Sequence, residues 1–471
     1  MNILIPFLTI RLATGRCDQP AITPVLRRAV WSLAVMAVGG VMALGVVDSC
    51  AADDWPQWMG PQRDGVYRET GVVEQIPEEG LPVLWRQPVS HGYSGPAVAA
   101  GKVLVTDYVV EHGEIRNDPS NRHRVHGKER VLCLEAASGE VLWTVEYERP
   151  YQISYPNGPR ATPTVDGKNV YVLGAEGDLL CLHLDDGHLI WKTSLPQQFG
   201  TQAPLWGYAA HPLVAGELVY CMAGGQGSAV VALDKRSGAV VWQNLDVDDI
   251  GYCPPMIHTL GGKPLLIVWH SQELCALDPL TGEVSWHYPL APRYGMAIAA
   301  PQLRGNLLFA SGIGQTAAML PIGPDGKPGE PLWTGRPKMG LYAGNATPLF
   351  TAEAIFGSDC ETGQYMAIDP HDGTRLWSTF ELTTGGSRRA SHGTAFTVRH
   401  GEHYFIFAET GDLLLADLSR DGFRIRGRMH VVDPTSECFG RSVVWSHPAF
   451  AQRCVFVRND REIVCVSLAV R

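Results

Sequence analysis

A repeated segment constrains this chain more than any other feature of its sequence. Copies of the template A-x-D-x-x-x-G-x-x-x-W, complete or loose, occur in six places and end at Trp143, Trp191, Trp242, Trp286, Trp333 and Trp377. Trp85 supplies the tail of another copy, and Arg426 stands where the tryptophan of an eighth copy belongs. The spacing between successive tryptophans suits four short strands with their turns. The sequence therefore predicts eight similar β-sheet units.

Each part of the template has a physical role. The aspartate accepts backbone N–H groups in a turn, and the glycine adopts the positive φ that the turn needs. The tryptophan follows at the end of a strand, where its ring can be buried between neighbouring units while its indole N–H reaches a carbonyl. We expect these tryptophans to clamp adjacent blades. Arg426 then predicts a looser junction, and Arg426→Trp is expected to raise the melting temperature.

The first strand of each unit can also be located. These inner strands are predicted to begin near Pro96, Pro163, Pro212, Pro254, Pro301, Pro348, Thr394 and Pro448. The strand before Trp85 lacks a unit of its own, and the last unit lacks a fourth strand. Pairing the two removes the free sheet edge. The prediction is an all-β fold: residues 81–471 form an eight-bladed β-propeller with four-stranded antiparallel blades and ring closure by N- and C-terminal strands, preceded by an extension over residues 53–80.

Charge and composition exclude some partners. Apolar residues make up 45% of the chain and charged residues 18%, with a net charge of -10. Nucleic acids and anionic membranes require a basic stripe, which the sequence lacks. We expect a monomer that binds no nucleic acid.

Residues 1–52 are interpreted as a leader and signal peptide. Arg27 and Arg28 precede an apolar run over residues 29–47, and small residues follow before Asp53. This order is typical of export to the periplasm or the outside of the cell. Three alternatives stay open: an uncleaved anchor, a lipid on Cys50, and a twin-arginine signal. Contact with a membrane is expected only through such an anchor.

Nine cysteines lie beyond the leader. Cys133, Cys181 and Cys465 occupy the repeat position where other units have alanine. Equivalent positions in different blades are too far apart for a disulfide, so we expect buried free thiols. The sequence has no CxxC, which argues against a zinc ribbon, a redox dithiol and covalent haem.

The repeat resembles that of the quinoprotein-type propeller family, whose units are called PQQ repeats after pyrroloquinoline quinone. The resemblance covers about residues 81–468, and the opening WPQWMGPQRDG is similar to the start of many exported PQQ-like repeat proteins. Membership would allow either a quinoprotein alcohol dehydrogenase or a binding scaffold. The dehydrogenases typically have a vicinal disulfide over the quinone, and this chain has no adjacent cysteines. The favoured scaffold hypothesis predicts no cofactor, and the alternative dehydrogenase would bind PQQ with calcium. Acids of the long loops, such as Glu146, Glu148, Asp248 or Asp249, would then be the calcium ligands.

The inner-strand entries predict a site around the central channel. A ring of polar and aromatic residues should face its mouth: Tyr93, Arg160, Tyr208, His211, Tyr252, Tyr294, Asn345, His392 and His447. Such residues can bind a polar or anionic ligand and stack on a ring. The alternative is that each merely hydrogen-bonds backbone and ordered water. The insertion over residues 106–130 should rise on the same side as a lid.

Two function classes remain. The favoured hypothesis is a non-enzymatic propeller that binds a protein, a peptide or a small polar ligand on its long-loop face. The alternative is a periplasmic PQQ-dependent alcohol or sugar dehydrogenase. No catalytic residue and no metal site is predicted. His91, His211, His392 and His447 belong to different blades and have no close spacing, which argues against a metal site formed by these four histidines.

Overall fold

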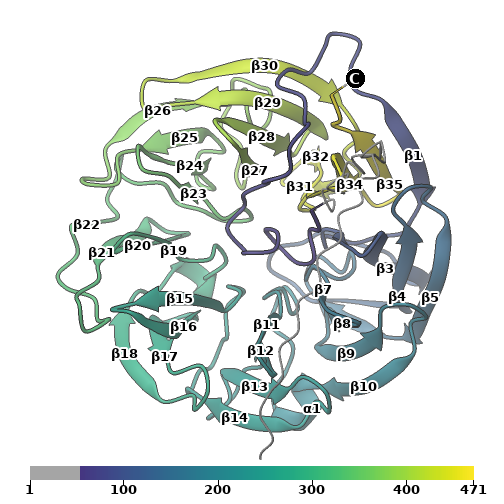
Figure 1. Cartoon of the computed structure of the whole chain (residues 1–471). Helices are drawn as coiled ribbons and strands as arrows, with labels where there is room; N and C mark the ends of the chain where they lie inside the picture. Colours follow the sequence, from purple (N-terminus) through teal and green to yellow (C-terminus); the bar gives the residue numbers. More distant parts are fainter. Residues whose placement is uncertain (1–52, 471) are drawn as a thin grey trace, which may run out of the picture. The chain divides into compact units, whose positions relative to one another are not determined.

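Eight four-stranded antiparallel sheets stand in a ring around a common centre (Figure 1). The computed structural model describes residues 53–470. The leader and signal-peptide interpretation of residues 1–52 lies outside this range. Strand 1 of each blade lies nearest the centre, and strand 4 lies at the periphery. The predicted all-β eight-bladed propeller is confirmed.

The first four blades follow the chain in order. Their strands are β2 (Ala97–Ala99), β3 (Lys102–His112), β4 (His123–Glu135) and β5 (Val141–Glu148) in blade 1, β7 (Thr164–Asp166), β8 (Asn169–Leu173), β9 (Asp178–His183) and β10 (Leu189–Ser194) in blade 2, β11 (Leu213–Ala215), β12 (Leu218–Met222), β13 (Val230–Asp234) and β14 (Val240–Asn244) in blade 3, and β15 (Met256–Leu260), β16 (Lys263–Trp269), β17 (Glu273–Leu277) and β18 (Val284–Pro289) in blade 4.

The other four blades complete the ring. Their strands are β19 (Gln302–Arg304), β20 (Leu307–Gly312), β21 (Thr316–Pro321) and β22 (Trp333–Thr334) in blade 5, β23 (Leu349–Phe350), β24 (Ile355–Ser358), β25 (Tyr365–Ile368) and β26 (Arg375–Thr379) in blade 6, β27 (Ala395–His400), β28 (His403–Ala408), β29 (Asp412–Leu418) and β30 (Phe423–His430) in blade 7, and β33 (Ala449–Ala451), β34 (Cys454–Arg458), β35 (Glu462–Ser467) and β1 (Val83–Pro88) in blade 8. Each inner strand begins within two residues of its predicted start.

A few short elements lie outside the blades. They are β6 (Tyr151–Ile153), which pairs with β4, the hairpin of β31 (Ser436–Cys438) and β32 (Arg441–Val443), the helix α1 (Leu195–Phe199) and the 3-10 turn η1 (Arg293–Gly295). In residues 53–470, no helix is long and apolar enough to cross a membrane.

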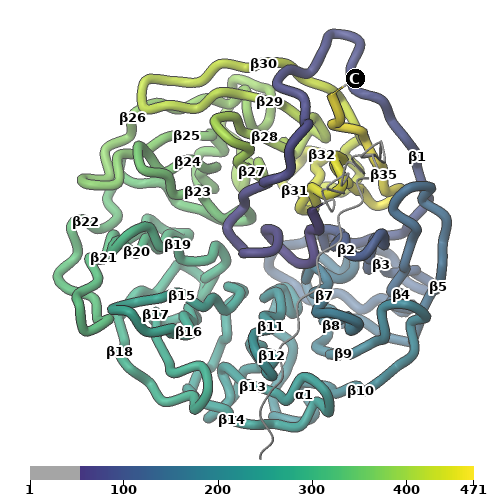
Figure 2. Tube along the Cα trace, viewed as in Figure 1, coloured from purple at the N-terminus to yellow at the C-terminus, as the bar shows by residue number. Residues whose placement is uncertain are grey.

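The ring closes as the sequence predicts. β1 pairs antiparallel with β35, and Trp85 lies opposite Cys465. The two strands run side by side at the rim in both views (Figures 1 and 2). The first and last strands of the propeller thus share one blade, so neither leaves a free edge.

The repeat tryptophans link neighbouring blades. Each of the seven donates its indole N–H to a carbonyl in the turn of the next blade, at 2.8–3.1 Å. At five of these junctions the turn glycine of that blade also packs against the same ring. A Cβ on Gly282, whose φ is +72°, would lie 2.5 Å from the Trp242 ring. The glycine is therefore needed both for its backbone conformation and for the close approach of the tryptophan.

The junction at Arg426 differs from the prediction. In blade 3, Ala232 lies opposite Trp242, whereas in blade 7 Ala416 lies opposite Ile425 and Arg426 falls in the bulge. The eighth copy has Leu418 in place of the turn aspartate, and the one turn amide bound by a side chain there is that of Asp421, which donates to Ser419 Oγ at 3.2 Å. The hairpin closes instead by a tight Ser419 N–H bond to the Gly422 carbonyl. This turn moves the bulge by one residue.

The space beside Arg426 is already filled. The extension packs directly against Gly427, the residue after Arg426: a Cβ added at Gly427 would lie 2.1 Å from the Ile76 carbonyl oxygen. Arg426 Nε donates to both carboxylate oxygens of Asp417, at 2.7 and 2.9 Å, and Nη1 donates to the Glu74 carbonyl at 3.4 Å. The extension, rather than a tryptophan, seals this junction.

We therefore expect Arg426→Trp to lower the melting temperature, which reverses the prediction from sequence. The substitution removes the partly exposed Arg426–Asp417 ion pair, which is worth about 0.5 kcal/mol. The extension already fills the junction, so the indole has no space to be buried there. Thermal unfolding of Arg426→Trp, with the exposed Arg424→Trp as a control, measures the effect. A higher melting temperature for Arg426→Trp alone would contradict this register.

The N-terminal extension crosses the central channel. The purple segment in Figure 1 runs over the middle of the ring before it reaches β1. Trp55 exchanges two backbone hydrogen bonds with Val98 of blade 1, and the Pro56 carbonyl accepts from Val165 of blade 2. On the opposite side, Tyr67 donates to the Arg399 carbonyl of blade 7. We call residues 53–70 the plug.

One buried cation holds the plug at its centre. The Arg63 side chain donates to the carbonyls of Pro212 at 3.0 Å, Pro255 at 3.3 Å and His211 at 3.4 Å. Burial lowers the pKa of Arg63 to about 9. Because both terminal nitrogens of Arg63 donate to backbone carbonyls of blades 3 and 4, Arg63 fixes the plug between two inner-strand entries.

The cysteines of the described chain behave as the repeat predicts. All nine are buried and free. Cys133, Cys181 and Cys465 lie opposite Trp143, Trp191 and Trp85, respectively. They occupy the position that needs a small apolar side chain beneath each tryptophan.

Candidate functional site

A cavity of about 680 Å³ opens at the entries of the inner strands. Eight of the nine predicted site residues line it: Tyr93, Arg160, His211, Tyr252, Tyr294, Asn345, His392 and His447. The ninth, Tyr208, does not, because it is buried in the core and donates its hydroxyl to the Ala223 carbonyl at 2.9 Å. The cavity has the size of a site for a cofactor or another small ligand.

The plug provides the floor of the cavity. The Trp58 ring stacks on His211, with centroids 4.9 Å apart, and meets His447 edge-on at 6.0 Å. Arg63 lies over the Trp58 ring at 5.2 Å. Trp58 is 3% exposed, so it closes the channel beneath the lining residues. The site is a pocket with a floor rather than an open channel.

Both floor histidines favour the neutral state. Burial lowers the pKa of His447 to about 3. Burial, with the nearby His447 and Arg63, also holds the pKa of His211 well below its usual value. The His211 Nδ1 accepts the Thr162 N–H at 2.8 Å, a bond that protonation of that nitrogen would break. The floor is therefore uncharged at neutral pH.

Arg160 brings a cation to the wall. Its guanidinium lies 5.6 Å from the centre of the Tyr93 ring. It donates to the carbonyls of Gly158, Ser154 and Tyr155. These partners are neutral, and burial lowers the pKa of Arg160. The wall thus offers a positive charge whose hydrogen-bond partners in the described chain are all uncharged.

Three polar atoms of the lining have no hydrogen-bond partner within the described residues. They are Trp58 Nε1 and the hydroxyls of Tyr93 and Tyr155. Both hydroxyls lie beside the Cys438 thiol, a weak acceptor. Buried polar groups are nearly always satisfied, so these atoms indicate a ligand or ordered water.

Backbone strain gathers around the same cavity. Tyr155, Tyr294, His392 and Phe439 all line it, and each has a φ between +48° and +61°. Bulky side chains rarely adopt this conformation, and each instance costs about 1 to 3 kcal/mol. The rings of His392 and Phe439 stack with centroids 5.1 Å apart. The fold thus keeps these rings at the rim at an energetic cost, as is common in preorganised sites.

Asp249 and Tyr252 of the lining come from the loop before β15, and Trp206 comes from the loop before β11. Trp206 meets Tyr252 edge-on at 5.6 Å. Asp249 is the one carboxylate among the described lining residues. Its pKa is raised by burial, which outweighs a hydrogen bond from the Gly251 amide. Of the four acids that the sequence suggested as calcium ligands, Asp249 alone lines the cavity.

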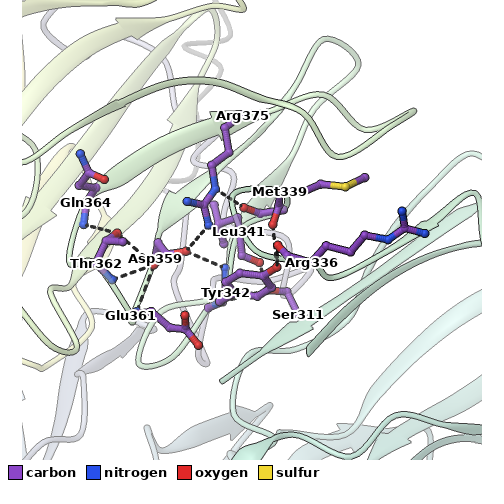
Figure 3. Close-up of polar contacts among 12 residues, drawn as sticks. Ser311, Arg336, Met339, Leu341, Tyr342, Asp359, Glu361, Thr362, Gln364 and Arg375 are labelled. Carbon is purple, nitrogen blue, oxygen red and sulfur yellow. Dashed lines mark hydrogen bonds and ion pairs between the residues drawn. The ribbon is translucent and has the colours of Figure 1, made fainter. Parts of the chain in front are cut away.

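A network in blades 5 and 6 positions another part of the wall (Figure 3). The buried Asp359 carboxylate accepts the Tyr342 amide at 3.2 Å and an Arg375 nitrogen at 3.4 Å. Arg375 also donates to the Gly340 carbonyl at 2.8 Å. These bonds hold the loop between β22 and β23, which carries Asn345 to the cavity.

The insertion over residues 106–130 reaches the same face. It extends β3 and β4 into a long hairpin, and Pro119 and Ser120 at its tip line the cavity. Asn117 donates to the Glu437 carbonyl at 2.8 Å, which ties the tip to the β31–β32 hairpin. Whether this hairpin acts as a lid stays a prediction.

The four histidines once considered for a metal do not come together as a set. His211 and His447 lie with ring centroids 5.7 Å apart. His392 instead stacks on Phe439, and His91 forms a bridge with Tyr108 of β3.

Sequence reasoning missed several lining residues, above all Trp58, Phe439 and Trp445. Trp58 precedes the repeats, and Phe439 lies in the turn of the β31–β32 hairpin outside the blade pattern. The long loops that precede β7 and β11 supply Tyr155 and Trp206. The repeat thus predicts the lining residues at the strand entries, whereas the plug and the β31–β32 hairpin supply Trp58 and Phe439 from outside the repeat pattern.

Comparison with known proteins agrees with the fold. A family model described as outer membrane protein assembly factor BamB matches residues 127–379, more than half of the chain. Two solved structures superpose over most of it. BamB from Moraxella catarrhalis has 16% identity and a TM-score of 0.53, covering 83% of this chain and 98% of that one. Quinohemoprotein alcohol dehydrogenase from Comamonas testosteroni has 12% identity and a TM-score of 0.54, covering 89% and 81%. No curated protein matches.

A closed ring of eight blades, with a tryptophan at seven of its junctions, defines the class as a PQQ-like repeat β-propeller. The chain belongs to the family of PQQ-like β-propellers described as outer membrane protein assembly factor BamB. At 16% and 12% identity, the similarity to the two solved structures supports the fold alone. It does not decide between an enzyme and a scaffold.

Proposed function

We propose that this propeller is a binding protein that captures a small, planar, anionic ligand in the pocket above Trp58. One observation carries the proposal: Arg160 brings a positive charge to an aromatic wall with only neutral hydrogen-bond partners among the described residues. Glu176 and Glu129 act on Arg160 only through space, so a carboxylate or sulfonate would supply a directly hydrogen-bonded counter-charge. The rings of Trp206 and Tyr252 offer faces and edges for a flat ligand.

Other features of the pocket support the same ligand class. The hydroxyls of Tyr93 and Tyr155 are donors without an oxygen or nitrogen partner in the described chain. The floor histidines are neutral and so do not compete for the anion. Strained rim residues argue for a preformed site, which lowers the ordering cost of binding.

The alternative is a PQQ-dependent alcohol or sugar dehydrogenase. PQQ itself is a planar tricarboxylate, so Arg160 and the aromatic walls fit it. Calcium fits less well, because it takes six to eight oxygen ligands and the described lining offers one carboxylate, Asp249, whose raised pKa favours the protonated form. The residues present thus suit a planar anion better than a calcium–quinone pair.

Ligand titration tests the proposal. PQQ and naphthalene-2,6-dicarboxylate, each with and without calcium, are added while fluorescence of the pocket tryptophans is followed. We expect saturable quenching by at least one of the two without calcium, and no dye reduction when an alcohol is supplied. Calcium-dependent PQQ binding with dye reduction would favour the dehydrogenase. No quenching by either anion would contradict the proposed ligand class.

Two variants locate the binding. Arg160→Met is expected to weaken binding roughly 10- to 100-fold, the worth of a hydrogen bond to a charged group. Tyr93→Phe removes a hydroxyl that satisfies no protein oxygen or nitrogen, so a several-fold weakening with an unchanged fold is expected. The exposed Arg424→Met serves as control. Equal affinity in all three variants would place the ligand elsewhere.

Export is part of this proposal. It rests on the arginine pair and apolar run of residues 27–47 and on the similarity of the opening segment to exported repeat proteins.

A further inference from the structure

Four metal-ligating side chains meet on blade 4, away from the pocket lining. They are His270, Glu273, Cys275 and His287. Ligand atoms of the first three all lie within 4.8 Å of one another. His287 completes the group, because its Nδ1 is 2.9 Å from Glu273 Oε1 and 3.4 Å from Cys275 Sγ. We call these four residues the blade-4 cluster.

The strand register explains why the four converge. Cys275 of β17 lies directly opposite His287 of β18, so their side chains share a face of the sheet. Glu273 precedes Cys275 by two residues and therefore points to the same face. His270 lies in the turn between β16 and β17, and its Nε2 is 3.7 Å from Glu273 Oε1 and 3.8 Å from Cys275 Sγ.

Four of the six separations between the ligand atoms are close to the edges of a coordination tetrahedron. Zinc binds histidine nitrogen and carboxylate oxygen at about 2.0 to 2.2 Å and thiolate at about 2.3 Å, which gives edges of roughly 3.3 to 3.8 Å. The measured separations run from 2.9 to 3.8 Å. His287 lies outside the compact group of three, so its ring has to turn toward His270 before all four residues can bind one ion.

The repeat itself does not call for these residues. The positions of Glu273, Cys275 and His287 are occupied by Ala229, Val231 and Gln243 in blade 3. In blade 2 they are occupied by Asp178, Leu180 and Lys192. Blade 4 thus differs from blade 3 at all three positions, and from blade 2 at the positions of Cys275 and His287, in each case toward a metal ligand.

Burial and access are also suitable. Cys275 is fully buried and His270 is 1% exposed, so neither side chain has water as an alternative partner. The His287 side chain is 48% exposed and Glu273 29%, which leaves an entry path from solvent. Coordination by His270 Nε2 places the ring proton on Nδ1, so the long 3.3 Å contact from the Gln272 amide would be lost.

We propose that the blade-4 cluster binds one divalent transition-metal ion, with zinc as the preferred ion. Imidazole and thiolate ligands select zinc, cobalt or copper over calcium and magnesium. Four protein ligands fill a tetrahedral shell, which is typical of a structural rather than a catalytic zinc site. The metal would cross-link the β16–β17 turn to β18. That turn lies close to the rim of the pocket. Its Ser271 packs against Gly295, where an added Cβ would lie 3.1 Å from Ser271 Cβ, and Gly295 follows the lining residue Tyr294.

Cobalt spectroscopy tests the site. The purified full chain, reduced with a non-chelating phosphine, is titrated with Co²⁺ and then with Zn²⁺. We expect one Co²⁺ per chain, with thiolate charge-transfer absorption and the visible bands of a tetrahedral ion, both lost as Zn²⁺ displaces it. Zn²⁺ should also raise the thermal midpoint. An absence of thiolate absorption at millimolar Co²⁺ would overturn the proposal.

Matched variants assign the ligands. Cys275→Ser and His287→Ala are each expected to abolish the thiolate absorption and the Zn²⁺-dependent thermal shift. The second variant alters a half-exposed residue and should fold normally. Cys181→Ser, which removes another buried thiol, and His188→Ala, which removes an exposed histidine, should retain both signals. Absorption that survives Cys275→Ser, or that Cys181→Ser abolishes, would overturn the assignment.

Discussion

Replacing Trp58 by alanine is expected to lower the free energy of unfolding by about 4 kcal/mol, the usual cost of truncating a buried tryptophan. The ring is 3% exposed and stacks on His211 at a centroid distance of 4.9 Å. It also carries the cation–π contact of Arg63. Its removal leaves a cavity at the channel centre and weakens the docking of the plug on blades 3 and 4.

Chemical denaturation measures this loss. Trp206→Ala is the matched control, since Trp206 lines the same pocket but is partly exposed and lies in a loop. We expect a clearly smaller loss there. Limited proteolysis should also cut within residues 53–70 of Trp58→Ala before it cuts the blades. Equal losses in the two variants, with an intact plug, would show that Trp58 is not the floor of the pocket.

Acidification is expected to destabilise the propeller through its floor histidines. Burial lowers the pKa of His447 to about 3 in the folded state, against about 6.5 in an unfolded chain. The unfolded chain therefore binds the proton first, and the stability present above pH 6.5 is lost as pH falls toward 3. At pH 4.5 this amounts to about 3 kcal/mol for His447. His211 acts in the same direction, because its pKa is lowered as well.

The variant His447→Phe isolates this effect. Phenylalanine is an aromatic replacement that suits the contacts with Phe396 and Trp58 and cannot be protonated. Urea denaturation at pH 7.5 and pH 4.5 should show that wild type loses about 3 kcal/mol more than His447→Phe over this interval. The exposed His188→Phe should behave as wild type. Buried carboxyls with a raised pKa, such as Glu129, offset part of the absolute loss but do not affect the comparison.

Tertiary context explains where the expectation for Arg426 failed. The template aligned Arg426 with the tryptophans, and by residue count that alignment is correct. The turn, however, has Leu418 in place of aspartate, and the hairpin closes more tightly around Gly422. The bulge then falls on Arg426, and residues 74–76 fill the junction. A match to the repeat template contains no information on residues 74–76, which are remote in sequence and occupy the space beside Arg426.

The sequence by itself determined the blades, their number and their closure. Local rules suffice for these, because turn chemistry, alternation and a tryptophan every few dozen residues act within one unit or between neighbours. They also placed the strand entries, and so brought eight of nine predicted residues to one cavity. The binding role of these residues remains a prediction. Tyr208 went to the core because position along an entry loop does not fix the direction of a side chain.

Only the tertiary structure decided what lies at the centre and on blade 4. Trp58 and Arg63 precede every repeat, and the Arg63 partners Pro212 and Pro255 lie 149 and 192 residues further along the chain. The blade-4 cluster likewise depends on cross-strand register, since Cys275 and His287 are 12 residues apart and no spacing motif joins them. Such contacts arise because a closed ring brings remote segments to one axis and antiparallel pairing brings alternate residues to one face.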